Sequence, residues 1–127
     1  MPKRRSKPLR LELEIPFSAL VPDNRRFLRN GFVLTPRYRE SKDAIFTLAR
    51  GQTRGPYPIF PDEPLDVNLR FKLPDKRRRD CSNLLKGLFD SLEDICYADD
   101  KQIAKMCWDK DIDRDNPRVE ITIVEVE

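Results

Sequence analysis

Residues 74 to 102 read Pro74-Asp75-Lys76-Arg77-Arg78-Arg79-Asp80-Cys81-Ser82-Asn83-Leu84-Leu85-Lys86-Gly87-Leu88-Phe89-Asp90-Ser91-Leu92-Glu93-Asp94-Ile95-Cys96-Tyr97-Ala98-Asp99-Asp100-Lys101-Gln102. A basic run leads into apolar residues that recur at helical spacing, and a pair of aspartates closes the segment. At about 100° per residue the apolar residues share one side of a helix. Asn83, Lys86 and Asp90 share the opposite side. The stretch therefore predicts an amphipathic helix over residues 82–95, with one side in the core and a short polar line on the other.

The rest of the chain adds strands and one more helix. Thr35 and Pro36 supply a capping hydroxyl and a proline at the first helical position, so a helix is expected from there to Gly51. Four stretches have the pattern of strands, mostly with apolar and polar residues in alternation: residues 11–17, 65–73, 103–110 and 119–123. This order predicts an α+β fold, a single domain with a roughly four-stranded mixed sheet and two main helices.

Composition excludes several kinds of site. The 127 residues include no histidine, which removes Ser-His-Asp and Cys-His catalysis and histidine-ligated zinc. The three cysteines lack Cys-x-x-Cys spacing, so they are expected to be free, structural thiols in a reducing, intracellular compartment. No apolar run is long enough for a membrane span, and no glycine pattern matches a phosphate-binding loop.

Positive charge is unevenly distributed although the formal net charge is only +3. Residues 1–9 are basic and contain two prolines, which predicts a flexible arm ahead of a folded domain over residues 10–127. A solvated tail and a DNA-contacting arm both remain open for this segment. A second basic cluster, residues 76–79, precedes the predicted helix and is suited to a phosphate backbone.

Three motifs in the quoted stretch match a known pattern in residue type and spacing. They are Arg79-Asp80-Cys81-Ser82-Asn83-Leu84-Leu85-Lys86, then Asp90-Ser91-Leu92, then Tyr97-Ala98-Asp99-Asp100-Lys101-Gln102. Together with the basic run they resemble the RusA family of Holliday junction resolvases. Asp23-Asn24-Arg25-Arg26 is similar to a turn of the same family.

The resemblance implies a RusA-like fold and a homodimeric endodeoxyribonuclease that resolves four-way DNA junctions by paired nicks in recombination and repair. It implies Mg²⁺ as cofactor, with Mn²⁺ as an alternative, and a cytoplasmic, nucleoid-associated or phage-encoded protein. The catalytic residues that it implies are Asp80, Asp100 and Lys86, and Asp99 joins the two aspartates as a metal ligand. The expected DNA contacts are Lys76, Arg77, Arg78, Arg79, Asn83, Arg25 and Arg26.

Carboxylates suit this chemistry because Mg²⁺ prefers oxygen ligands and activates water for phosphodiester hydrolysis. Asp80 follows a predicted strand and Asp100 precedes another, so the two are expected to meet at one end of the sheet. Simpler roles remain open for the same residues. Lys86 and Asp90 have the spacing of an i, i+4 ion pair, and Asp99 with Asp100 has the composition of a turn.

Ser82 departs from the family pattern, which has a second aspartate there. A serine at this position is also a suitable N-cap for the helix. Metal binding is expected to persist through Asp80, Asp100 and either Asp99 or Asp90. Two alternatives to the nuclease stay open: a junction-binding protein that has lost cleavage through Ser82, and a small basic protein-interaction domain.

Overall fold

The computed structural model of the chain describes residues 10–22 and 34–126. The predicted arm (1–9) and two of the predicted DNA contacts, Arg25 and Arg26, lie outside this part. The described part contains strands β1 (Leu11–Pro16), β2 (Leu65–Leu73), β3 (Ile103–Ile112) and β4 (Arg118–Glu125), helices α1 (Pro36–Gly51) and α2 (Leu85–Leu92), and short 3-10 helices η1 (Phe17–Ala19), η3 (Cys81–Leu84) and η4 (Asp100–Gln102).

The strands form one mixed sheet in the order β1-β4-β2-β3. β4 pairs antiparallel with both β1 and β2, whereas β2 and β3 are parallel. Burial alternates along β1, β2 and β4, since one face of each strand is in the core. The predicted fold class, an α+β domain with four strands and two main helices, is confirmed.

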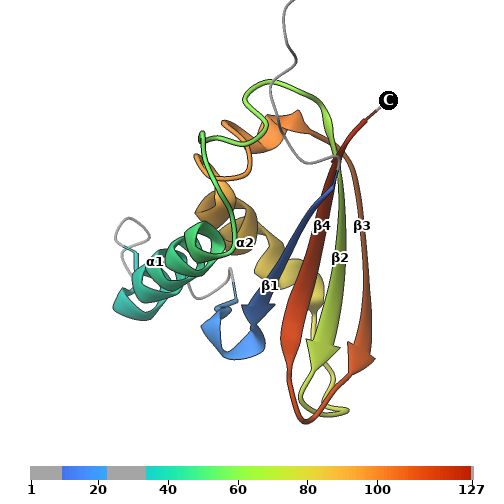
Figure 1. The fold of residues 1–127 in the computed structure, drawn as a ribbon. Helices are drawn as coiled ribbons and strands as arrows, with labels where there is room; N and C mark the ends of the chain where they lie inside the picture. Colours follow the sequence, from blue (N-terminus) through green and yellow to red (C-terminus); the bar gives the residue numbers. More distant parts are fainter. Residues whose placement is uncertain (1–9, 23–33, 127) are drawn as a thin grey trace, which may run out of the picture.

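Both α-helices lie on the same face of the sheet, and the core fills the space between the two layers (Figure 1). The sheet contributes buried residues such as Ile15, Phe71 and Ile121, and the predicted helix contributes Leu88 and Leu92. Burial of each such side chain stabilises the fold by roughly 1.5–3 kcal/mol. No helix in the described ranges combines the length and the apolar character needed to cross a bilayer.

The two helices pack closely through a glycine. A Cβ atom added at Gly87 of α2 would lie 2.7 Å from the hydroxyl oxygen of Tyr38, a buried residue of α1. α1 begins as predicted, because the Thr35 side chain accepts a hydrogen bond from the Tyr38 backbone N–H at 3.2 Å. The absence of a side chain at Gly87 therefore allows the two helices to approach each other.

The predicted helix 82–95 is shorter in the structure. It starts with one 3-10 turn, and α2 ends at Leu92. Asp94 has φ 69°, in the left-handed region, and Glu93 is already extended. The backbone N–H groups of Ile95 and Cys96 then turn back to the Leu92 carbonyl.

β3 differs from the other strands because it lies at the edge of the sheet. Most of its side chains are exposed. The expectation of structural cysteines is correct for Cys81 and Cys96, which are buried, but wrong for Cys107 of β3, which is exposed.

Candidate active site

The site begins at the end of the basic loop, where Asp80 caps the 3-10 helix η3. Its carboxylate accepts the backbone N–H of Ser82 at 3.1 Å and also the Ser82 hydroxyl. Asp80, rather than Ser82, is therefore the capping residue. The serine donates to its neighbour instead of capping the helix through its own oxygen.

Lys86, on the first turn of α2, connects the helix to the aspartate pair. Its ammonium nitrogen lies 3.1 Å from an Asp90 oxygen and 3.8 Å from an Asp100 oxygen. The pKa of Lys86 is raised, chiefly by the hydrogen bond to Asp90 and then by its negative charge. The i, i+4 ion pair of Lys86 with Asp90 is thus present, and Asp100 extends it into a three-residue contact.

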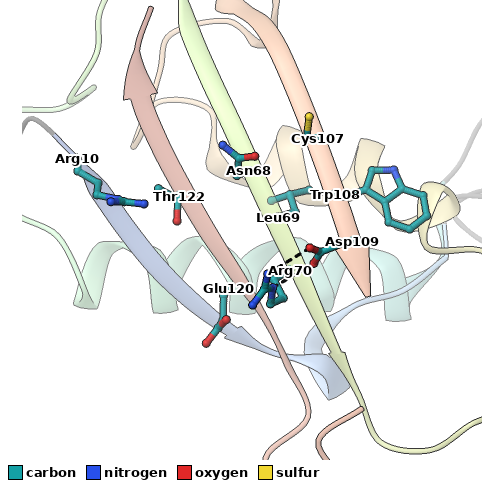
Figure 2. Close-up of a pocket in the computed structure, with 9 residues that line it drawn as sticks. All are labelled: Arg10, Asn68, Leu69, Arg70, Cys107, Trp108, Asp109, Glu120 and Thr122. Atoms are coloured by element: carbon teal, nitrogen blue, oxygen red, sulfur yellow. Dashed lines mark hydrogen bonds and ion pairs between the residues drawn. The ribbon is translucent and has the colours of Figure 1, made fainter. Parts of the chain in front are cut away.

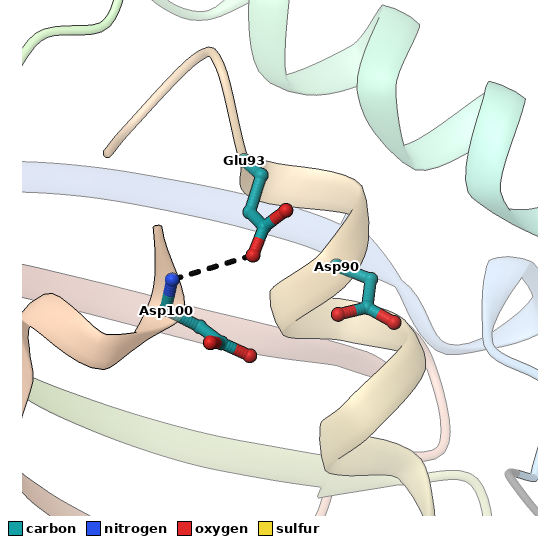
Figure 3. Close-up of side chains that lie close together, drawn as sticks. All are labelled: Asp90, Glu93 and Asp100. Atoms are coloured by element: carbon teal, nitrogen blue, oxygen red, sulfur yellow. Dashed lines mark hydrogen bonds between the residues drawn. The ribbon is translucent and has the colours of Figure 1, made fainter. Parts of the chain in front are cut away.

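Three carboxylates gather beside this lysine. One oxygen each from Asp90, Glu93 and Asp100 lies within 4.8 Å of the others, and all three residues are half-buried. Figure 3 shows the three side chains converging from the end of α2 and from the start of η4, with Glu93 accepting the Asp100 backbone N–H at 3.3 Å. We refer to Asp90, Glu93 and Asp100 as the acidic cluster.

The acidic cluster fits the chemistry of a hard divalent cation. Two oxygens on opposite sides of Mg²⁺ are roughly 4 Å apart, because each lies at about 2.1 Å from the ion. The observed spread of the three oxygens, within 4.8 Å, is therefore close to what one cation requires. Glu93 and Asp100 are also held relative to each other by their hydrogen bond.

The expectation that Asp80 and Asp100 meet at one end of the sheet is wrong. Because β2 and β3 are parallel, the end of β2, which leads to Asp80, and the start of β3, which follows Asp100, lie at opposite ends of the sheet. Asp80 is not a member of the acidic cluster.

The basic loop, residues 74–80, has one cation in a structural role. Arg79 contacts Asp75 at 2.7 Å, and its guanidinium lies over the Phe17 ring, 5.3 Å from the ring centroid. The pKa of Asp75 is lowered to about 2, first by the hydrogen bonds from the Arg79 side chain and then by the Arg77 backbone N–H. Arg79 therefore anchors the loop to the body of the domain.

The other cations of this loop are available to a ligand. Lys76, Arg77 and Arg78 are exposed, and they line a cavity of about 400 Å³ together with Lys110 of β3. Asn83 is half-buried in η3. The described part of the predicted DNA-contacting set thus lies along the loop and the following turn.

Similarity to known proteins extends over most of the chain. The family model of endodeoxyribonuclease RusA matches residues 16–124, which covers the sheet, both helices and the site. The chain belongs to the RusA endodeoxyribonuclease family. A crossover junction endodeoxyribonuclease rusA of Enterobacteria phage HK97 is 43% identical over 44 residues, which are 35% of this chain and 37% of that relative. The match thus spans little more than a third of the relative's length.

The RusA motif around Asp99 has a clear structural basis. Asp99 caps η4 by accepting the Lys101 backbone N–H at 2.9 Å, and the Gln102 side chain accepts the backbone N–H of Asp99 at 3.1 Å. The same amide donates to the carbonyls of Phe60 and Glu63. The Asp-Asp-x-Gln motif therefore fixes the turn that presents Asp100 to the acidic cluster.

Glu93 is the member of the RusA site that the sequence interpretation did not include. It follows Asp90 by three residues, so it continues the polar line of the helix formed by Asn83, Lys86 and Asp90. Extension of that line by one more turn would have identified it. The helix ends between Asp90 and Glu93, which turns the glutamate toward Asp100.

Proposed function

We propose that this RusA-family protein is a divalent-metal-dependent endonuclease that cuts four-way DNA junctions, with Mg²⁺ as the expected ion and Mn²⁺ as the alternative. The single observation that carries the proposal is the acidic cluster with Lys86 beside it. The family and the name of the phage HK97 relative support junction DNA as the substrate. The proposed setting is recombination and repair in the cytoplasm.

The acidic cluster would hold the ion, and its three carboxylates would supply most of the ligand charge. When bound, such an ion activates water and neutralises charge that develops on the phosphate. Glu93 would take the place of the aspartate that the family pattern has at Ser82, because it adds a third carboxylate to Asp90 and Asp100. Asp80 and Asp99 remain proposed ligands through the resemblance alone.

Lys86 is proposed to donate to the scissile phosphate or to the leaving oxygen. Its side chain is 52% exposed, so its ammonium is accessible while two carboxylates hold it in place. The raised pKa keeps this group protonated at neutral pH. A fixed cation of this kind stabilises negative charge that appears in the transition state.

The basic loop is proposed to hold the DNA backbone near the cluster. Lys76, Arg77 and Arg78 would contact phosphates, with Asn83 next to them at the start of the helix. Arg79 would contribute mainly through its bridge to Asp75, which orders the loop. Arg25 and Arg26 remain proposed contacts outside the described residues.

A homodimer is part of the proposal. A junction with two-fold symmetry that is cut at two related positions needs two active sites related by a matching two-fold axis. One chain carries one acidic cluster in its described residues. Paired nicks would therefore come from two copies.

The first test is metal binding followed by cleavage of a synthetic four-way junction. Wild-type protein should bind Mn²⁺ at sub-millimolar to millimolar concentration in an electron paramagnetic resonance titration and should nick the junction in Mg²⁺. Asp100→Asn and Glu93→Gln should weaken Mn²⁺ binding at least about tenfold, since each removes a charged ligand. Asp115→Asn, in the exposed turn before β4, is the matched control and should match wild type.

Unchanged metal binding in both cluster variants would exclude the cluster as the metal site. Asp80→Asn provides the comparison for the proposed ligand outside the cluster. Loss of cleavage with normal Mn²⁺ binding in that variant would assign Asp80 a role other than holding the first ion.

A second function is favoured by the contact between Ser82 and Asp80. The serine hydroxyl and backbone N–H both donate to the Asp80 carboxylate, which occupies one oxygen that a metal would otherwise use. The alternative is a junction-binding protein without cleavage. Tight, structure-selective binding without nicks, and nicks gained by Ser82→Asp, would favour this alternative over the nuclease.

A further inference from the structure

The outer edge of β3 is a long strand edge. β3 is the last strand in the order β1-β4-β2-β3, and among residues 10–22 and 34–126 only β2 pairs with it. It runs for 10 residues, Ile103–Ile112. Such an edge presents a row of backbone N–H and C=O groups that another strand can pair with.

The helix-side face of this strand is apolar and only partly covered. Met106 and Ile112 are 37% and 38% exposed, which places them among the exposed large hydrophobic residues of the described chain. Trp108 lies between them and packs edge-on against Phe71, with ring centroids 5.9 Å apart. Contact with another apolar surface would therefore remove exposed hydrophobic area from water.

The opposite face of β3 is charged, and the signs change along the strand. Lys105, Cys107 and Asp109 follow one another on that face, where Asp109 also pairs with Arg70 of β2 at 3.1 Å. Figure 2 shows Cys107 and Asp109 along the strand, with the ion pair to Arg70 drawn. Charged side chains on an edge usually hinder pairing with another chain. Here their order makes the strand complementary to itself.

We propose that β3 pairs antiparallel with β3 of a second copy of this chain, in the register that sets Cys107 opposite Cys107. A two-fold axis perpendicular to the sheet keeps each face on its own side, so opposite residues must belong to the same face. In this register Lys105 lies opposite Asp109 of the second copy, and Met106 lies opposite its Trp108. Each contact occurs twice, because the axis generates its symmetric counterpart.

Neighbouring registers are less favourable on charge and polarity. Centring on Asp109 sets two aspartates against each other, and centring on Lys110 sets two lysines against each other. Centring on Trp108 sets Met106 against Lys110. Opposite charges and apolar pairs across strands stabilise a sheet, whereas like charges directly opposite destabilise it. The Cys107 register is the one in which the central charged and apolar pairs all match.

This inference rests on the homodimer of the proposed function and specifies its surface. In this register the start of β3, which follows Asp100, lies beside the end of the second copy's β3. Lys110, Asp111 and Ile112 at that end line the same cavity as the exposed cations of the basic loop. The pairing would thus bring the acidic cluster of each copy and the basic loop of the other to the same end of the joined sheet.

Cross-linking through Cys107 tests the register. Directly opposite residues in an antiparallel pair have Cα atoms about 4.5–5.5 Å apart, which is within the range of about 4.4–6.8 Å found for disulfides. The full-length protein treated with a mild oxidant should form a disulfide-linked dimer whose yield is insensitive to dilution above the dimer dissociation constant. Cys107→Ser should abolish it, since Cys81 and Cys96 are buried.

A charge exchange provides the second readout. Lys105→Asp should raise the dimer dissociation constant about tenfold in analytical ultracentrifugation, because two lysine–aspartate pairs become aspartate–aspartate pairs. Adding Asp109→Lys should restore dimer formation, which a merely structural effect of either substitution would not do.

A dimer that shows neither the Cys107 cross-link nor the charge rescue would overturn the inference, and so would a monomer at all concentrations. Junction cleavage by the same samples is measured separately. Nicking by a protein that fails both dimer tests would leave the nuclease in place and reject only this interface.

Discussion

At the residue scale, the three cysteines differ in environment although none is in a disulfide. Burial raises the pKa of Cys96 to about 12, because a thiolate there would lose its hydration, and burial also raises the pKa of Cys81. Cys107 is exposed on the edge strand. Since thiolates rather than thiols react with disulfide reagents, Cys107 should be the reactive site of the native protein.

A thiol titration checks this expectation. In the native protein at pH 8, one thiol per chain should react rapidly with an aromatic disulfide reagent, and all three should react after unfolding in denaturant. Cys107→Ser should remove the rapid phase. Two rapid thiols in native protein would contradict the burial of Cys81 or Cys96.

Part of the candidate site could be predicted from single residues and their spacing. Lys86 and Asp100 were identified from the motif, and the structure brings them within 3.8 Å. The convergence of Asp90 with Glu93 and Asp100 depends on where the helix ends, which the left-handed Asp94 determines. Local spacing does not specify that turn, so Glu93 was missed.

At the element scale, Gly87 controls the distance between α1 and α2. Gly87→Ala should lower the free energy of unfolding by about 1–3 kcal/mol, because its Cβ would lie 2.7 Å from the Tyr38 hydroxyl oxygen and the helices would have to move apart. Gly51→Ala at the end of α1 is the matched control. Its Cβ would meet nothing within 4 Å, so it should be neutral or stabilise by up to ~1 kcal/mol.

Chemical denaturation of the two variants beside wild type measures the difference. Equal stability of the Gly87 and Gly51 variants would mean that α2 moves away from α1 at no cost, and the close packing of the helices would not matter.

The basic loop allows a test at the same scale. Arg78→Ala should reduce the slope of log binding constant against log salt by about 0.9 for each phosphate that the variant no longer neutralises, provided that the loop tracks the DNA backbone. Arg37→Ala, exposed on the first turn of α1, is the control and should leave the slope at its wild-type value. Equal slopes for Arg78→Ala and wild type in a salt series of fluorescence anisotropy would exclude binding of Arg78 to a phosphate.

Strands with one buried face were the most predictable elements. β1, β2 and β4 alternate apolar and polar residues, and the structure confirms them with small shifts of their ends. β3 was predicted as a strand, but its parallel pairing and its edge position were not. These depend on contacts between distant segments, which alternation within one segment does not encode.

At the scale of the whole molecule, buried acidic groups make stability depend on alkaline pH. The pKa of Cys96 is raised by burial to about 12, and that of Tyr97 is raised in the same direction and mainly for the same reason. The unfolded chain releases the Cys96 proton near pH ~8.5, whereas the folded chain keeps it. Between these values the folded state binds more protons, so the free energy of unfolding falls as pH rises.

Denaturation at several pH values should therefore show a decline in stability above about pH 8.5–9. Cys96→Ala should make that decline shallower, even where the variant is less stable at neutral pH because its core is less well packed. Tyr97 should preserve the rest of the slope. An identical pH dependence in the variant and wild type would mean that Cys96 does not contribute to the decline.

Trp108 is the one tryptophan of the chain, and it lies half-buried on β3 against Phe71. The indole emission of the protein therefore originates entirely from this strand. Any event that changes the polarity around β3 should shift the emission maximum, while events elsewhere leave it nearly constant. The protein thus carries an intrinsic optical probe at its sheet edge, and dilution or addition of DNA can be followed there without a label.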